Sequence, residues 1–241
     1  MSGADNWHPV GLSYSIEAGS SAGTRLFGQE LVVWRDTSGV AHVWQDRCPH
    51  RGMKLSFGFV RGDHIACLYH GWQYDRGGYC QYIPAHPDLE VPKTIKVPVY
   101  LTREQGGMIW TALSENPLPL PDVGEPTVPL RSLYFGCSFD AAVAALGAIR
   151  LVPFATDAAA DTTVSRVSDT LFAVTCAQER LLVGVQAISN TRTAFHLSIC
   201  GPPEFYQGAG QNHFLGWALQ LRHALEHSPL AAYPVVGREV A

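Results

Sequence analysis

The sequence predicts a mainly β protein, in which an antiparallel β domain over residues 7–115 precedes a small α+β domain over residues 131–228. Three observations support this fold class. Short apolar and β-branched runs recur through the first half, five prolines interrupt residues 116–130, and the last part of the chain carries an apolar stripe with helical spacing. We therefore expect two domains joined by an extended, proline-rich linker over residues 116–130.

The first domain is predicted to be a small antiparallel sandwich or barrel. Its clearest turn signals lie at residues 36–39 and 75–78, where glycine permits the positive φ of a hairpin turn. Between these turns the runs are short and show no helical period, which favours closely spaced strands. The predicted strands are residues 30–35, 41–45, 64–68, 72–74, 96–101 and 107–113.

The second domain is predicted to contain helices at both ends and strands between them. Residues 140–150 are rich in alanine, and Asp140 could cap the first helix. A closing helix is expected from about Asn212, with Phe214, Trp217 and Leu221 on its apolar stripe. The predicted strands are residues 164–167, 171–176, 181–189 and 194–200.

Composition argues against several classes of function. Of the 241 residues, 46% are hydrophobic, so the chain can bury a core and is not expected to be disordered. Lysine and arginine total 17 against 21 acidic residues, a net charge of −4 that argues against nucleic-acid and anionic-membrane partners. No apolar run approaches the roughly 18 residues of a membrane span, and the N-terminus does not resemble an export signal, so we expect a cytoplasmic protein.

The cysteines and histidines include the candidate metal ligands. Cys48-Pro49-His50 is followed, after sixteen residues, by Cys67-Leu68-Tyr69-His70, so each segment offers one sulfur and one nitrogen. Four such donors could hold one tetrahedral zinc ion, and zinc is the first alternative. Zinc sites usually pair like ligands within a segment, however, whereas the mixed pairs here suit two adjacent irons, with both cysteines on one and both histidines on the other. Cys80, Cys137, Cys176 and Cys200 lie outside this pattern and are expected to be buried structural thiols.

The motif resembles that of Rieske [2Fe-2S] proteins. The flanking residues Arg51-Gly52, Leu55-Ser56-x-Gly58 and Gly71-Trp72-x-Tyr74-Asp75 are similar to the N-terminal domain of Rieske non-heme iron oxygenases, including ring-hydroxylating and vanillate-demethylase-like enzymes. The resemblance covers residues 7–115. It implies one [2Fe-2S] cluster per chain, held by Cys48, His50, Cys67 and His70.

Residues next to the four ligands have expected supporting roles. Gly52 and Gly71 would let backbone N–H groups approach sulfur, and Tyr69 could donate a hydrogen bond to sulfur. Trp72 and Tyr74 could shield the cluster. Filling a small β core is an equally good explanation for the aromatic residues. Arg51 belongs to a locally basic stretch that also contains Arg47, Lys54 and Arg61, which could steer an acidic reductase or could be an ordinary solvated surface.

The second half departs from the resembled family. Its catalytic domains bind mononuclear iron through two histidines and a carboxylate, in a pattern like Asp-x2-His-x4-His after the linker, on a helix-grip sheet. No histidine lies between residues 113 and 195, so the domain resembles a truncated helix-grip fold and mononuclear Fe(II) is not expected in this chain. His223 and His227 share a helix face and could chelate a metal, but an exposed pair is the better expectation; His196 is expected to be a hydrogen-bonded core or surface residue.

Three hypotheses follow. The first is an electron-transfer subunit that takes single electrons from a reductase or ferredoxin and passes them to mononuclear iron on another polypeptide, in an oligomer that could include a separate catalytic subunit. The second is a self-contained compact oxygenase or demethylase with an atypical iron site. The third is a non-enzymatic, redox-sensing module whose cluster state alters partner binding.

Overall fold

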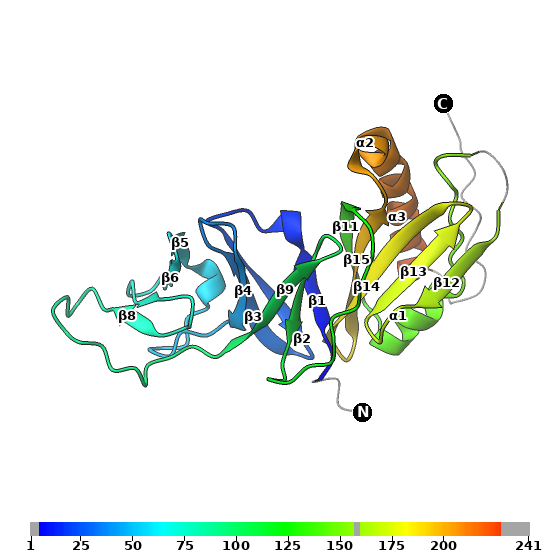
Figure 1. The fold of residues 1–241 in the computed structure, drawn as a ribbon. Helices are drawn as coiled ribbons and strands as arrows, with labels where there is room; N and C mark the ends of the chain where they lie inside the picture. The colour runs from blue at the N-terminus through cyan, green and yellow to red at the C-terminus, as the bar shows by residue number, and fades with distance from the viewer. Residues whose placement is uncertain (1–4, 157–159, 228–241) are drawn as a thin grey trace. The chain divides into compact units, whose positions relative to one another are not determined.

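The computed structural model describes residues 5–156 and 160–227, and the chain divides into two units (Figure 1). The first unit comprises Met1–Glu104 and Ile109–Leu118, and the second comprises Gln105–Met108 and Pro119–Ala241. The protein is mainly β, as predicted: an all-β unit precedes a unit of antiparallel sheet and helices. The tip of the hairpin at residues 105–108 belongs to the second unit, although the sequence places it inside the first domain.

The first unit is built on a six-stranded sheet. Its strand order is β1-β10-β9-β4-β3-β2, so the first and the last strand of the unit are neighbours at one edge. Alternating apolar residues of β3 and β4 fill the core on one face, including Leu31, Val33 and Val43. The strands are β1 (His8–Leu12), β2 (Ser21–Leu26), β3 (Gln29–Arg35), β4 (Ala41–Gln45), β9 (Val99–Gln105) and β10 (Met108–Ala112).

A four-stranded antiparallel sheet lies beside the other face of β3 and β4. Its strands are β5 (Phe59–Arg61), β6 (His64–Ala66), β7 (Gln73–Tyr74) and β8 (Cys80–Tyr82), in sequential order. A short 3-10 turn, η3 (Leu55–Phe57), leads into it. Trp34 and Trp44 from the larger sheet share one buried core with Ile65 and Tyr74 from the smaller one, and this shared core holds the two sheets of the unit together.

The second unit is a five-stranded antiparallel sheet with helices packed on one face. The strand order is β11-β15-β14-β13-β12, and odd-numbered residues of β14 and β15 form the core with α1 and α3. The strands are β11 (Thr127–Phe135), β12 (Thr162–Arg166), β13 (Leu171–Cys176), β14 (Glu179–Ser189) and β15 (Arg192–Cys200). The helices are α1 (Phe139–Leu146), α2 (Pro203–Tyr206) and α3 (Ala209–His227).

Three predicted boundaries in this part of the chain are wrong. The linker ends earlier than residue 130, because β11 begins at Thr127; Pro129 is tolerated there because β11 is an edge strand with a bulge between Pro129 and Arg131. Helix α1 is capped by Ser138, whose Oγ accepts from the N–H of Ala141, so Asp140 lies inside the first turn. Helix α3 begins at Ala209, three residues before the predicted Asn212.

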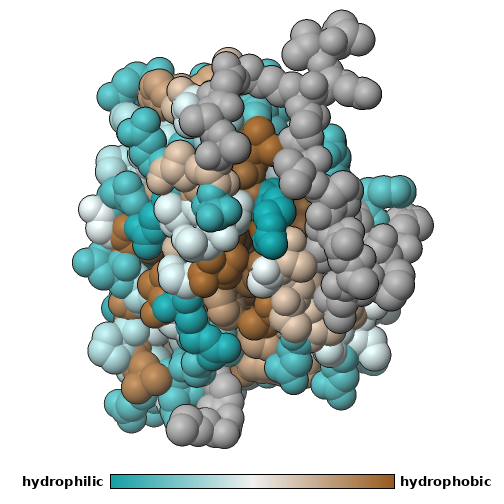
Figure 2. Space-filling view, turned by 90° about the vertical axis from the view of Figure 1, so that its right-hand side faces the viewer, coloured by the Kyte–Doolittle hydropathy of each residue, from teal (hydrophilic) through white to brown (hydrophobic). Residues whose placement is uncertain are grey.

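The surface of the second unit is mixed in character. Seen from the side of β12 and α1, apolar residues gather near the middle of the face and hydrophilic residues surround them (Figure 2). None of the helices in the described ranges combines the length and the hydropathy of a membrane-spanning segment.

Candidate metal centre

Two loops with the same hydrogen-bond pattern carry the four candidate ligands. In the first loop, the Cys48 N–H donates to the carbonyl of Met53 at 2.8 Å and the Gly52 N–H donates to the carbonyl of Cys48 at 2.8 Å. In the second loop, the Cys67 N–H donates to Trp72 at 2.8 Å and the Gly71 N–H donates to Cys67 at 2.9 Å. The first loop follows β4, and the second connects β6 to β7.

A glycine with positive φ closes each of these loops. Gly52 has φ +73° and Gly71 has φ +70°, a conformation that side chains with a Cβ rarely adopt. The N–H groups of the two glycines bond the cysteine carbonyls, and the N–H groups that point at sulfur come from the residues between each cysteine and its glycine. The contribution of the glycines is to turn the chain sharply enough to bring the histidine back beside the cysteine.

The two sulfurs lie together in the core that the two sheets of the first unit share. The Cys48 and Cys67 thiols contact one another, both are buried, and neither is in a disulfide. Backbone N–H groups of His50 and Arg51 point at the Cys48 sulfur, and those of Tyr69 and His70 point at the Cys67 sulfur. These four donors stabilise negative charge on the sulfurs, which is the form that binds metal.

Tyr74 is a sulfur donor that sequence analysis missed. Its hydroxyl donates to the Cys48 Sγ at 3.0 Å, and the Tyr74 ring is fully buried. Burial raises the pKa of Tyr74, so the hydroxyl keeps its proton and remains a donor. The sequence prediction assigned this role to Tyr69, whose side chain instead lies against the His70 ring, with centroids 3.8 Å apart.

The two thiols differ in acidity because they interact with each other. The hydrogen bond from Cys67 lowers the pKa of Cys48 to about 5, with help from Tyr74 and the N–H groups, against the opposing effect of burial. The same contact, together with burial, raises the pKa of Cys67. In the thiol pair, Cys48 therefore carries the negative charge and Cys67 keeps its proton. Metal binding would displace that proton.

The two histidine rings also lie together, closer to the surface than the sulfurs. Their centroids are 4.7 Å apart, His50 is half-buried and His70 is exposed. Trp72 stacks on His50 with centroids 4.3 Å apart and nearly parallel planes, which fixes the orientation of that ring. Within the described residues, neither ring makes a hydrogen bond, so their nitrogens are available to a metal.

A buried carboxylate, that of Asp46, connects the two ends of the first loop. Asp46, at the end of β4, accepts hydrogen bonds from the Ser56 N–H at 2.7 Å and from the Ser56 Oγ at 2.6 Å. This connection spans the segment that contains Cys48 and His50 and joins its two ends. Arg47, Arg51 and Arg61 of the expected basic stretch are exposed, whereas Lys54 pairs with Glu30 at 2.6 Å.

The donor set fits a [2Fe-2S] cluster with two cysteines on one iron and two histidines on the other. Sulfur is paired with sulfur and imidazole with imidazole, although each loop supplies one of each. In the described ranges, no three His, Cys, Asp or Glu side chains gather as ligands of a single metal ion.

The other candidate residues are not part of the two ligand loops. His196 is fully buried and hydrogen-bonded to Ser132 and Gln186, as expected for a core histidine. His223 is exposed on α3, and the side chain of its predicted partner His227 lies outside the described side chains. Among the remaining cysteines, Cys80, Cys176 and Cys200 are buried as predicted, but Cys137 is only half-buried.

Comparison with known proteins agrees with this geometry. Residues 6–100 match the Rieske [2Fe-2S] domain family. The chain is 38% identical over 123 residues to the oxidoreductase NdmD of Pseudomonas putida and 40% identical over 116 residues to the methylxanthine N1-demethylase NdmA of the same species. These alignments cover 51% and 46% of this chain, but only 20% and 32% of those two proteins, so the matched part is a fraction of each relative.

Solved structures extend the likeness to the fold of both units. NdmA of Pseudomonas putida CBB5 with caffeine superimposes with a TM-score of 0.72 at 18% identity, covering 98% of this chain and 86% of that one. Dicamba monooxygenase with non-heme iron and dicamba gives a TM-score of 0.73 at 16% identity, covering 92% and 87%.

The first unit is therefore a Rieske domain, which implies a [2Fe-2S] cluster. The chain is thus a Rieske domain protein, related through this domain to the N-terminal part of Rieske non-heme iron oxygenases. It shares the fold of the solved oxygenases over nearly its full length.

Proposed function

We propose that this chain is a one-electron carrier of a Rieske-type oxygenase or demethylase, with Cys48 and Cys67 binding one iron and His50 and His70 binding the other. The observation that carries the proposal is the like-with-like pairing of two thiols and two imidazoles across two matching loops. When bound, a cluster of this type accepts and releases single electrons.

The residues around the centre suit that role. Four backbone N–H groups and the Tyr74 hydroxyl direct positive dipoles at the sulfurs, which offsets the negative charge gained on reduction. The histidine side of the centre faces the surface, where His70, Leu68 and Tyr69 are exposed. A partner that docks there would approach the ligands closely without unfolding any part of the unit.

The partners that we propose are a reductase or ferredoxin as electron donor and a mononuclear iron site as acceptor, in an oligomer. The donor is proposed because NdmD is named an oxidoreductase and other relatives are named oxygenase subunits or components. The acceptor is placed on another polypeptide because the pattern Asp-x2-His-x4-His is missing from residues 113–195.

A second candidate is a complete compact oxygenase with its own mononuclear iron. The observation that favours it is the fold, because the likeness extends over 85–87% of the solved oxygenase chains rather than over the Rieske domain alone. His223, together with His227, would then be the first residues to examine.

Metal content and spectroscopy test the proposal. Anaerobically purified chain should contain two irons and two acid-labile sulfides, and the dithionite-reduced protein should give the electron paramagnetic resonance (EPR) signal of a reduced Rieske cluster. Three irons per chain, lowered to two by the double change His223→Ala and His227→Ala, would support the compact oxygenase instead. A colourless protein with one zinc would overturn both.

A further inference from the structure

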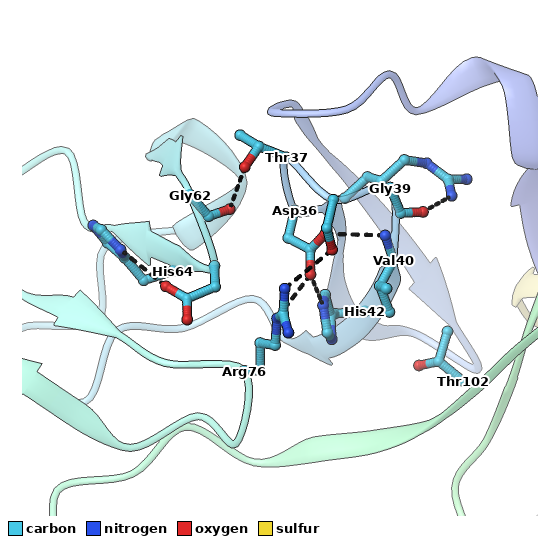
Figure 3. Close-up of polar contacts among 12 residues, drawn as sticks. Asp36, Thr37, Gly39, Val40, His42, Gly62, His64, Arg76 and Thr102 are labelled. Carbon is cyan, nitrogen blue, oxygen red and sulfur yellow. Dashed lines mark hydrogen bonds and ion pairs between the residues drawn. The ribbon is translucent and has the colours of Figure 1, made fainter.

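The turn between β3 and β4 bonds to the four-stranded sheet at two points (Figure 3). Thr37 donates to the carbonyl of Gly62 through its N–H at 2.9 Å and through its Oγ1 at 3.2 Å. The Nε of Arg76 lies 2.8 Å from the Oδ2 of Asp36, and another guanidinium nitrogen of Arg76 donates to the Ser38 Oγ at 3.1 Å. Gly62 lies in the turn between β5 and β6, and Arg76 lies in the turn between β7 and β8.

Asp36 is the centre of this connection. Its side chain is fully buried, and both of its oxygens are occupied: Oδ1 accepts from the Ser38 Oγ at 2.7 Å and the Val40 N–H at 3.0 Å, and Oδ2 contacts His42 at 3.2 Å as well as Arg76. Burial opposes ionisation, but these donors and the charge of Arg76 more than offset it and hold the pKa of Asp36 well below its usual range. A fully satisfied buried carboxylate fixes the groups around it, because moving any one of them leaves a charge without its partner.

The anchored turns flank the hairpin that carries the second ligand loop. Strand β6 begins at His64, two residues after Gly62, and β7 ends at Tyr74, two residues before Arg76. These strands have three and two residues, and a hairpin that short is not stable in water without packing or anchoring. The first ligand loop, in contrast, leaves the five-residue strand β4 directly and is closed by Asp46.

We propose that Asp36, acting through Arg76, is a positioning residue that sets where Cys67 and His70 lie relative to Cys48 and His50. The inference rests on the proposed function, since it concerns the alignment of the two halves of the donor set. Asp36 touches none of the four ligands. It connects the sheet from which the first loop leaves to the far end of the hairpin that carries the second loop, and so keeps the thiols paired and the rings paired.

The test uses the full chain loaded with its cluster, in the variants Asp36→Asn, Arg76→Met and the double variant. Iron loss to a ferrous chelator, measured well below the melting temperature, should be about tenfold faster in each single variant, the size of effect that outer residues of metal sites commonly have. The EPR signal of the reduced cluster should broaden. The double variant should lose iron no faster than the faster of the two single variants, because both substitutions remove the same connection.

Two controls separate positioning from general destabilisation. Asp169→Asn removes an exposed ion pair with Arg166 in the second unit and should leave both readouts unchanged. Arg76→Lys keeps the positive charge on a half-exposed side chain and should restore most of the slow iron loss. This variant and Arg76→Met keep the test available if Asp36→Asn does not fold.

Three results would overturn the inference. If both single variants lost iron at the wild-type rate and gave the wild-type EPR line shape, the connection between Asp36 and Arg76 would not position the loops. Opposite shifts of the midpoint potential in Asp36→Asn and Arg76→Met, with unchanged line shape, would show that the pair acts only through its charges. Both results leave the proposed function intact, whereas a wild-type chain that forms no [2Fe-2S] cluster overturns the proposed function and this inference with it.

Discussion

The histidine pair of the ligand loops in the first unit and His196 in the second unit contrast in how their nitrogens are used. In the first unit, His50 and His70 are held by ring contacts with Trp72 and Tyr69, and within the described residues their nitrogens make no hydrogen bonds. In the second unit, the Ser132 Oγ is 2.8 Å from the Nδ1 of His196, and the Gln186 Oε1 is 2.8 Å from its Nε2. A histidine that is oriented by stacking keeps its nitrogens for a metal, whereas one whose nitrogens are both occupied is a structural residue.

The largest expected effect is the loss of the cluster when one ligand of the first unit is removed. Cys67→Ala or His50→Ala should lower iron from two atoms per chain to nearly none, because in each variant one iron loses one of its two protein ligands and the bridged pair does not hold together. Iron and sulfide analysis of the purified variants measures this effect. Cys80→Ala is the matched control, since Cys80 is buried in the same core but lies outside the ligand loops; a cluster retained in Cys67→Ala would contradict the assignment.

Removal of His196 should damage the second unit without affecting the cluster. His196→Ala leaves a cavity and removes the hydrogen bonds that the imidazole makes with Ser132 and Gln186, so we expect the free energy of unfolding to fall by about 3 kcal/mol. Chemical denaturation followed by fluorescence measures this change. The exposed His223→Ala should change stability by less than about 0.5 kcal/mol, and loss of iron in His196→Ala would break the contrast between the units.

The same histidine predicts a pH dependence of stability. Burial lowers the pKa of His196 from 6.5 to about 4, so the unfolded chain binds a proton that the folded chain excludes. The neutral, buried His196 therefore contributes to the free energy of unfolding above pH 6.5, and this contribution is lost as the pH falls towards 4. Between pH 7 and pH 5 the loss amounts to about 2 kcal/mol. Denaturation at both pH values should show this loss in the wild type and a smaller one in His196→Gln, which cannot bind the proton; equal losses would contradict the assignment.

The smallest expected effect concerns the tyrosine donor of the first unit. Tyr74→Phe removes the hydrogen bond to the Cys48 sulfur, so the midpoint potential should fall by roughly 40 mV, the one-electron equivalent of about 1 kcal/mol. A spectroscopic redox titration measures the shift. Tyr79→Phe is the control, because Tyr79 is exposed and its hydroxyl contacts Lys96; the same shift in both variants would exclude a specific role for Tyr74.

The fold was predictable where a strand buries a clear apolar pattern. Strands β4 and β13 have the predicted bounds, because their residues pack into a core on both sides. Strands β2 and β5 were missed, since both are largely exposed edge strands whose sequences carry no alternation. Pairing with a neighbour in the sheet, rather than their own side chains, makes these segments extended.

The sequence by itself determined which residues are the candidate ligands and that they lie on two short loops, because the cysteine, the histidine and the closing glycine of each loop lie within five residues of one another. The motif also predicted that sulfur pairs with sulfur and imidazole with imidazole, and the two loops bring them together in this way. Only the tertiary structure decided that Tyr74 rather than Tyr69 reaches Cys48 and that Asp36 bonds Arg76, forty residues further along the chain. The physical reason is that spacing along the chain governs local turns, whereas contacts between loops depend on which strands become neighbours in the folded core.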